Sequence, residues 1–214
     1  MSEMTVVTVA VAKGRILAET RVALAAQGTV LPAALGDGET LRASCGGVCW
    51  VVPRPQDVPV YVARGAVDLG ITGQDCLWEH DLPGVTRVAD LGLGACRLVL
   101  AAPAGRLPVA GSPLVVATRY PRTTEAYFAQ RRWPVTVVPL AGSVELAAVT
   151  NLADAVVDLS ATGRTLAANG LVEVAEVARS VAVLLASPGV LVGRPAGVAG
   201  WVERFGSLAA AVPS

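Results

Sequence analysis

The stretch from Asp154 to Leu166, which reads DAVVDLSATGRTL, predicts a strand that ends in a polar loop and continues into a helix. Its first part is apolar and rich in valine, as buried strands are, and Asp158 stands near the carboxyl end of that strand. The loop carries hydroxyl groups, a glycine and an arginine: Ser160, Ala161, Thr162, Gly163, Arg164 and Thr165. Backbone N–H groups, hydroxyls and a guanidinium in such a loop can hold a phosphate. An acid at the strand end can hold ribose hydroxyls or Mg²⁺.

Two other interpretations of this stretch have to be weighed. Capping of the helix by Thr162 would explain a hydroxyl at this place without any ligand. A nucleotide triphosphatase loop is disfavoured, because the spacing G-x-x-x-x-G-K does not occur here.

A second strand, turn and helix are predicted near the start of the chain. Residues 6–11 form a β-branched apolar run, and apolar residues at helical spacing follow over residues 16–26. Lys13, Gly14 and Arg15 lie between them, and Lys13 is the only lysine among 17 basic residues. Gly14 would let a ligand approach the backbone, and the two charges suit a phosphate. An ordinary turn with solvated basic side chains is the alternative.

Short strands and short helices alternate along the rest of the chain. Further strands are predicted over residues 48–52, 67–72, 86–91, 97–101, 114–118, 135–140, 155–159, 172–177 and 181–186, and helices over 55–63, 74–79, 123–131, 144–148 and 198–210. Such alternation is typical of parallel βαβ units, and therefore of an α/β fold. The glycine-rich residues 91–94 resemble a crossing between two series of units. We therefore expect two lobes with a ligand cleft between them.

The composition argues against several classes of protein. The formal net charge is zero and charged residues make up 16% of the chain, so a surface that coats nucleic acid is not expected. Mean hydropathy is +0.57, yet no apolar stretch approaches the roughly 20 residues of a membrane helix. The first residues do not resemble a secretory signal, which favours a soluble cytoplasmic protein. Cys45 and Cys49 lack the second ligand pair of a structural zinc site, so no protein-held metal is expected.

Six segments, taken in order, resemble ATP phosphoribosyltransferases. They read VAKGRIL, RPQDVPVYV, GAVDLGITGQD, DLGLGACRLVLA, the pair VATRYP and AGSVELA, and LADAVVDLSATGRTLAANGLVEV. Each segment is modestly specific, whereas the ordered set is highly specific and covers most of the chain. The chain ends soon after the last segment and therefore resembles the short form of the family, which lacks an additional regulatory domain.

The resemblance implies a two-lobed fold similar to type II periplasmic binding proteins. The first lobe would hold residues 1–92 and 181–214, and the second residues 93–180. For the substrates it implies that phosphoribosyl pyrophosphate is bound by Asp154, Asp158 and the loop from Ser160 to Thr165. Lys13 and Arg15 match a KGR-type turn near the pyrophosphate, and Arg42 matches an arginine that helps pyrophosphate to leave. The residues expected near ATP are Gly70, Thr72, Gly73 and Glu145.

The resemblance also implies a reaction and partners. N1 of the ATP adenine would attack the anomeric carbon of phosphoribosyl pyrophosphate and release pyrophosphate, which is the first step of histidine biosynthesis. Mg²⁺ would arrive bound to the substrate. A homodimer would assemble with a regulatory subunit similar to histidyl-tRNA synthetase.

Two alternatives stay open at this point. One is a non-catalytic two-lobed module that binds a small ligand, since solute-binding proteins and effector domains share this fold; neither of them would need the loop after Asp158. The other is a phosphoribosyltransferase that acts on free bases. That type usually carries two adjacent acids before its loop, whereas only Asp158 stands there in this chain.

Overall fold

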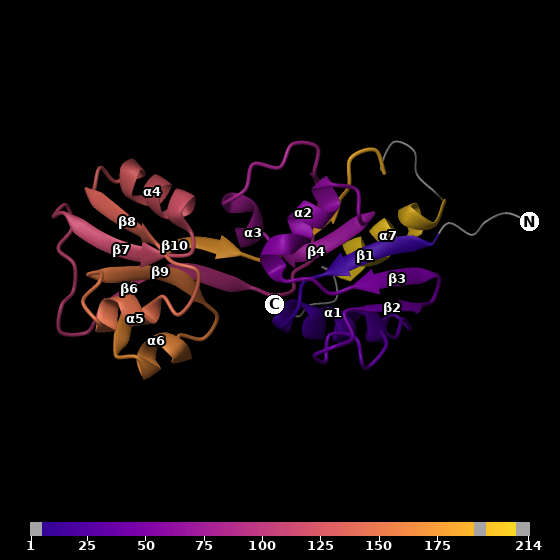
Figure 1. The fold of residues 1–214 in the computed structure, drawn as a ribbon, viewed down its shortest axis with the longest axis horizontal. Helices are drawn as coiled ribbons and strands as arrows, with labels where there is room; N and C mark the ends of the chain where they lie inside the picture. The colour runs from indigo at the N-terminus through magenta and orange to yellow at the C-terminus, as the bar shows by residue number, and fades with distance from the viewer. Residues whose placement is uncertain (1–5, 191–195, 209–214) are drawn as a thin grey trace, which may run out of the picture. The chain divides into compact units, whose positions relative to one another are not determined.

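The computed structural model describes residues 6–190 and 196–208 and divides the chain into two compact units (Figure 1). Unit 1 extends to Gly94 and resumes at Val181, and unit 2 comprises Ala95–Ser180. Unit 2 is therefore an uninterrupted segment, whereas unit 1 is built from two separate pieces of chain.

Unit 1 contains a six-stranded sheet in the order β2-β3-β1-β4-β11-β5. Its strands are β1 (Val7–Val11), β2 (Arg42–Cys45), β3 (Val48–Val51), β4 (Leu69–Gly73), β5 (Thr86–Asp90) and β11 (Ala182–Ala186). Its helices are α1 (Arg15–Ala26), α2 (Val58–Ala63), α3 (Asp75–Trp78) and α7 (Ala196–Gly206), with a 3-10 turn over Pro55–Asp57. Helices α1 and α7 pack in one apolar cluster, and α2 packs in another with residues that point to the opposite face of β1 and β11.

Unit 2 contains a five-stranded sheet in the order β10-β6-β9-β7-β8. The strands are β6 (Cys96–Pro103), β7 (Leu114–Thr118), β8 (Val135–Pro139), β9 (Ala155–Ser160) and β10 (Leu171–Ser180). Helices α5 (Glu145–Val149) and α6 (Arg164–Ala168) cover one face, where Val99, Ala101 and Val156 form the core with them. Helix α4 (Pro121–Gln130) lies on the other face (Figure 1).

Both sheets are mixed: they contain the parallel strands that βαβ units predict, together with antiparallel strands that the alternation did not indicate. Strands β1, β3 and β4 are parallel, as are β7, β8 and β9, but β2, β5, β6, β10 and β11 each run antiparallel to a neighbour. A parallel pair needs a crossover of a dozen or more residues, and the connection from β2 to β3 is only two residues long. Gly46 and Gly47, with φ of 61° and 76°, form a two-residue hairpin turn that forces β2 against β3.

Most predicted elements occur within one or two residues of their expected bounds. The strand β2 was not predicted, because it is a short edge strand with largely exposed side chains and no apolar alternation. The predicted helix over residues 55–63 begins as a 3-10 turn. The last two residues of the predicted C-terminal helix, 209 and 210, lie outside the described residues. No helix in the described ranges has the length and apolarity that a membrane span requires.

Candidate active site

The loop that follows β9 is built as the sequence predicts, with a strand, three connecting residues and a short helix. Gly163 precedes α6 in the left-handed conformation, with φ of 72°, which explains a glycine at this place. Thr162 does not cap the helix; its hydroxyl accepts a long hydrogen bond from Arg164 Nε at 3.4 Å. Instead the Ser160 hydroxyl accepts the Gly163 N–H at 3.1 Å, which closes the turn.

Several donors of this loop are not used inside the protein. Within the described part of the chain, no hydrogen bond is donated by the backbone N–H of Ala161, Thr162 or Thr165. The side chains of Ala161, Thr162 and Thr165 are exposed, so a ligand can reach this segment. The arrangement therefore offers N–H groups, hydroxyls and the Arg164 guanidinium to an anion.

Asp158 is held in place by an arginine from the neighbouring strand. Arg119 Nη2 donates to Asp158 Oδ1 at 2.8 Å, and the Leu159 N–H donates to the same oxygen at 2.8 Å. The Asp158 side chain is only 8% exposed, whereas Arg119 is 35% exposed. Burial by itself lowers the pKa of Arg119, but the hydrogen bond and charge of Asp158 outweigh it and raise that pKa overall. Arg119 is thus a permanent cation beside the acid.

The parallel register of the sheet brings Arg119 and Asp158 together. Thr118 on β7 pairs with Val157 on β9, so Arg119, which directly follows β7, stands beside Asp158 on β9. The sequence carries Arg119 within VATRYP, but no site role was predicted for it. Its position directly after a predicted strand was the available signal.

These residues line two adjoining pockets within unit 2. One pocket, of about 320 Å³, is lined by Arg119, Glu145, Asp158 and the loop from Leu159 to Leu166. The other, of about 410 Å³, shares Arg119, Glu145, Asp158 and Thr165 with it. Their size is that of sites for small ligands, and their charged groups suit a phosphorylated sugar.

Lys13 and Gly14 lie at the carboxyl edge of the sheet of unit 1. The Lys13 N–H donates to Pro53 O at 2.9 Å, and the Ala12 N–H donates to Ile71 O at 2.9 Å, so the ends of β1, β3 and β4 meet there. Gly14 has φ of 93°, and a side chain added to it would meet nothing within 4 Å. Lys13 is exposed, and its ammonium makes no ion pair with any residue described. Its charge is therefore available to a ligand.

Arg15 and Arg42, in contrast, already make contacts within unit 1. Arg15 Nη2 donates to Gly94 O at 2.7 Å, and Glu19, 3.8 Å from Arg15 Nη1, accepts the Gly94 N–H at 2.6 Å. Arg42 Nε donates to Cys49 Sγ at 3.1 Å, a contact that raises the pKa of the exposed guanidinium. Arg42 pairs with Val51 at the end of β3, so it lies at the same edge of the sheet as Lys13.

The residues predicted for ATP belong to both units. Gly70 is buried against α2, where an added Cβ would lie 2.5 Å from Val62. Thr72 is fully buried and donates to Pro55 O at 2.9 Å. It also contacts Cys76, whose thiol stays protonated because burial raises its pKa to about 12. Gly73 is buried at the end of β4, whereas Glu145 lines the pockets of unit 2.

The structure also separates Asp154 from the other residues predicted for phosphoribosyl pyrophosphate. Asp154 precedes β9, whereas Ser160 ends it, so the strand lies between Asp154 and the loop. The Asp154 carboxylate accepts the Val115 N–H at 2.9 Å, and Asp154 lines neither pocket. The Asp154 carboxylate therefore bonds the backbone near the start of β7.

Among the described residues, no group of three His, Cys, Asp or Glu side chains could hold a metal ion. None of the four cysteines forms a disulfide.

Comparison with known proteins relates this chain to one family. The profile of the HisG family, ATP phosphoribosyltransferase, matches residues 54–206. ATP phosphoribosyltransferase of Rubrobacter xylanophilus is 43% identical over 204 residues, which cover 92% of this chain and 94% of that protein. The enzyme of the same name from Thermus thermophilus is 44% identical over 179 residues, 83% of this chain and 84% of the relative.

Solved structures agree with the sequence relatives. The ATP phosphoribosyl transferase (HisG:HisZ) complex from Thermotoga maritima contains a chain with a TM-score of 0.78 and 27% identity, over 96% of this chain and all of that one. The periplasmic aliphatic sulphonate binding protein SsuA from Escherichia coli shares only the fold, with a TM-score of 0.63 and 14% identity over 95% of this chain and 68% of its own. The two-lobed α/β fold of the type II binding proteins is thereby confirmed, and this chain belongs to the ATP phosphoribosyltransferase family.

Proposed function

We propose that this chain transfers the 5-phosphoribosyl group of phosphoribosyl pyrophosphate to N1 of ATP, and that the pocket of unit 2 binds the phosphoribosyl part. The observation that carries the proposal is the pairing of Asp158 with Arg119 beside a loop in which the N–H groups of Ala161, Thr162 and Thr165 have no partner in the described residues. Membership of the family supports the reaction, which gives N1-(5-phosphoribosyl)-ATP and pyrophosphate and begins histidine biosynthesis.

The loop after β9 is assigned to the 5-phosphate. Thr162, Arg164 and Thr165 supply hydroxyls and a positive charge, and Ala161 contributes its backbone N–H. Asp158 Oδ1 is occupied by Arg119, so the other carboxylate oxygen is the acceptor that can take a ribose hydroxyl. Asp154 is left out of this assignment because its carboxylate bonds Val115 at the other end of β9.

The basic residues of unit 1 are assigned to the pyrophosphate and to ATP. Lys13 is the strongest candidate, since its charge has no partner among the described residues. Arg15 and Arg42 can join it only by exchanging their present contacts with Gly94 and Cys49. Gly70, Thr72, Gly73 and Glu145 stay predictions for ATP; Gly73 ends β4, and Glu145 lines the pockets of unit 2.

The chemistry asks for charge stabilisation and not for a base. Adenine N1 offers a lone pair and carries no proton, so its attack on the anomeric carbon forms the C–N bond while the C–O bond electrons leave with pyrophosphate. Positive charge placed beforehand near that oxygen lowers the barrier, which is the role given to Lys13. Asp158 orients the ribose so that the attacked carbon faces adenine.

Mg²⁺ is proposed to enter with the phosphates of the substrate. The described residues offer no ligand cluster, but one oxygen of Asp158 stays available to a partly hydrated ion. Bound there, Mg²⁺ would neutralise part of the pyrophosphate charge.

The first test measures pyrophosphate release from ATP and phosphoribosyl pyrophosphate with Mg²⁺, together with the absorbance of the adduct, for the wild type and Asp158→Ala. Turnover by the wild type that falls sharply in the variant, while far-UV circular dichroism stays unchanged, supports the reaction and the site. Turnover with free bases in place of ATP contradicts the choice of acceptor. Ligand binding without turnover, even after a regulatory subunit is added, would favour the non-catalytic module.

We further propose that a homodimer of this chain assembles with a regulatory subunit similar to histidyl-tRNA synthetase in the cytoplasm. The support is the similarity of this chain to a chain of the HisG:HisZ complex from Thermotoga maritima. Light scattering of the chain alone and mixed with such a subunit tests the assembly, and two separate peaks in the mixture would contradict it.

A further inference from the structure

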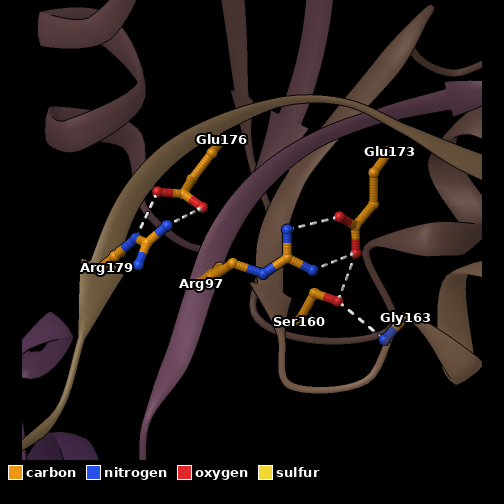
Figure 2. Close-up of polar contacts among 6 residues, drawn as sticks. All are labelled: Arg97, Ser160, Gly163, Glu173, Glu176 and Arg179. Atoms are coloured by element: carbon orange, nitrogen blue, oxygen red, sulfur yellow. Dashed lines mark hydrogen bonds and ion pairs between the residues drawn. The ribbon is translucent and has the colours of Figure 1, made fainter.

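Arg97 and Glu173 form an ion pair beside the candidate phosphate loop. Arg97 Nη1 lies 2.8 Å from Glu173 Oε2, and Arg97 Nη2 donates to Glu173 Oε1 at 3.0 Å, so the pair is bidentate (Figure 2). Arg97 belongs to β6 and Glu173 to β10, and their side chains are 39% and 29% exposed. This geometry fixes the direction of the Glu173 carboxylate.

The carboxylate is connected to the loop through one hydroxyl. Ser160 Oγ donates to Glu173 Oε1 at 2.9 Å and accepts the Gly163 N–H at 3.1 Å (Figure 2). A serine hydroxyl has a single proton, and an ionised carboxylate can only accept. The buried Ser160 hydroxyl therefore donates its only proton to Glu173 and accepts the Gly163 N–H. Neither group is then free to bind a phosphate.

The sheet register places these residues on one face. Ser160 pairs with Arg97, and Glu173 pairs with Ala101. Arg97 and Ala101 are four residues apart on β6 and point to the same face, so their partners Ser160 and Glu173 do so as well. Asp158 pairs with Val99 and joins the same face. Two bulges in β10 bring Glu176 and Arg179 to this face as well.

We propose that Glu173, oriented by Arg97, is a positioning residue for the loop from Ser160 to Thr165, and that Ser160 transmits its effect. The inference rests on the proposed function of that loop as the 5-phosphate site. With the Ser160 hydroxyl fixed, the Gly163 N–H is turned inward and the turn is closed. The N–H groups of Ala161, Thr162 and Thr165 are then held ready before phosphate arrives.

Arg97 has a second role, which follows from charge. A carboxylate beside an anion site repels phosphate, and the bidentate guanidinium compensates that charge. Removal of Arg97 alone leaves Glu173 uncompensated next to the loop. We therefore expect Arg97→Ala to weaken phosphoribosyl pyrophosphate binding more than the double variant Arg97→Ala/Glu173→Ala does.

The kinetic test compares Michaelis constants for the two substrates. Glu173→Ala is expected to raise KM for phosphoribosyl pyrophosphate about tenfold or more, with KM for ATP and kcat changed less than about threefold. Glu173→Gln, which keeps an oxygen for Ser160, should restore most of the loss. Ser160→Ala/Glu173→Ala should be no worse than the more affected single variant, because both act through one contact.

The chain offers a matched control in Glu176 and Arg179. Arg179 Nε donates to Glu176 Oε1 at 2.8 Å on the same strand, and Figure 2 shows this pair apart from Ser160 and Gly163. Glu176→Ala removes an equivalent carboxylate and should leave both KM values unchanged. Equal effects of Glu173→Ala and Glu176→Ala, or effects of Ser160→Ala and Glu173→Ala that add, would overturn the inference.

A measurement without turnover separates this inference from the proposed function. Amide exchange of Gly163, followed by NMR in glycine-labelled protein, should be slow in the wild type and in Glu176→Ala, and about tenfold faster in Glu173→Ala and Ser160→Ala. Unchanged exchange in these two variants contradicts the positioning role even in an active enzyme. Faster exchange in a protein without turnover would support the positioning role and contradict the phosphoribosyltransferase function instead.

Discussion

The two units hold their charged residues in different ways. In unit 2, Arg119, Asp158 and the loop are bonded to one another or to strands of the same sheet, and they line shared pockets. In unit 1, Lys13 has an exposed side chain, Arg15 bonds the backbone at Gly94, and Arg42 bonds a cysteine. Unit 2 thus presents a pre-organised site, whereas unit 1 presents separate charges that a ligand must gather.

This difference leads to a general expectation. Substitutions at the unit 2 site should weaken binding of the phosphoribosyl part and local stability together, because the hydrogen bonds that shape the site also hold its strands and loop in place. Substitutions of exposed basic residues in unit 1 should damage turnover and leave the free protein intact.

The largest effect is expected for Asp158→Ala, which removes the acceptor for ribose. We expect kcat/KM for phosphoribosyl pyrophosphate to fall about 10³-fold, as for the loss of a pre-organised active-site group. The control is Asp154→Ala, which removes an acid at the other end of β9 and should cost less than about threefold. Steady-state kinetics of both variants measure these losses in kcat/KM. A large loss for Asp154→Ala would indicate that Asp154 belongs to the binding site.

Lys13→Ala should produce the next largest effect. We expect kcat to fall about 10²-fold with KM for phosphoribosyl pyrophosphate nearly unchanged, because the ammonium is assigned to charge that develops on the leaving group. The melting temperature should stay that of the wild type, since the exposed side chain has no ion pair in the described residues. A lower melting temperature would contradict the expectation that exposed basic residues of unit 1 do not stabilise the free protein. A change in KM with kcat unchanged would contradict the role given to Lys13 at the leaving group.

Arg119→Met tests, in the absence of substrate, whether the bonded residues of the unit 2 site also stabilise the free protein. The substitution leaves the 8%-exposed Asp158 without its cation, and we expect the free energy of unfolding to fall by about 1–3 kcal/mol. This range lies below that of a fully buried pair because water screens the partly exposed Arg119. Urea unfolding measures it, and the double variant Arg119→Met/Asp158→Asn should recover part of the loss.

The smallest effect is expected for Arg15→Ala. Its guanidinium is half exposed and donates to Gly94 O, so its loss should cost about 1 kcal/mol of unfolding free energy or less. If Arg15 also leaves Gly94 to bind pyrophosphate, kcat/KM should fall even though the variant remains almost fully folded. Urea unfolding and kinetics on the same preparation separate the two contributions.

The sequence predicted what local patterns encode. The apolar run before Asp158, the glycine at 163 and the hydroxyl-rich loop lie within a dozen residues, and their arrangement was predicted correctly. The same holds for β1, the turn at Gly14 and α1. In these segments each residue's role depends on near neighbours along the chain.

Features that depend on distant strands were not predictable in this way. Arg119 meets Asp158 across 39 residues, and Arg97 meets Glu173 across 76 residues, through pairings that no local pattern specifies. The antiparallel direction of β11 depends on the path of the chain between units and not on its own apolar residues. Gly70 is expected near ATP, but the group that approaches it closely in the structure is helix α2, a contact between distant segments that no local pattern specifies.

The position of β11 has a consequence for synthesis on the ribosome. Strand β11 lies between β4 and β5, and all five of its residues are buried, so the sheet of unit 1 stays incomplete until residue 186 has emerged. Residues 95–180 emerge before it as one continuous segment with every strand of the second sheet. Unit 2 can therefore fold completely before unit 1, although its synthesis begins later. Until β11 has emerged, the sheet of unit 1 lacks the strand between β4 and β5.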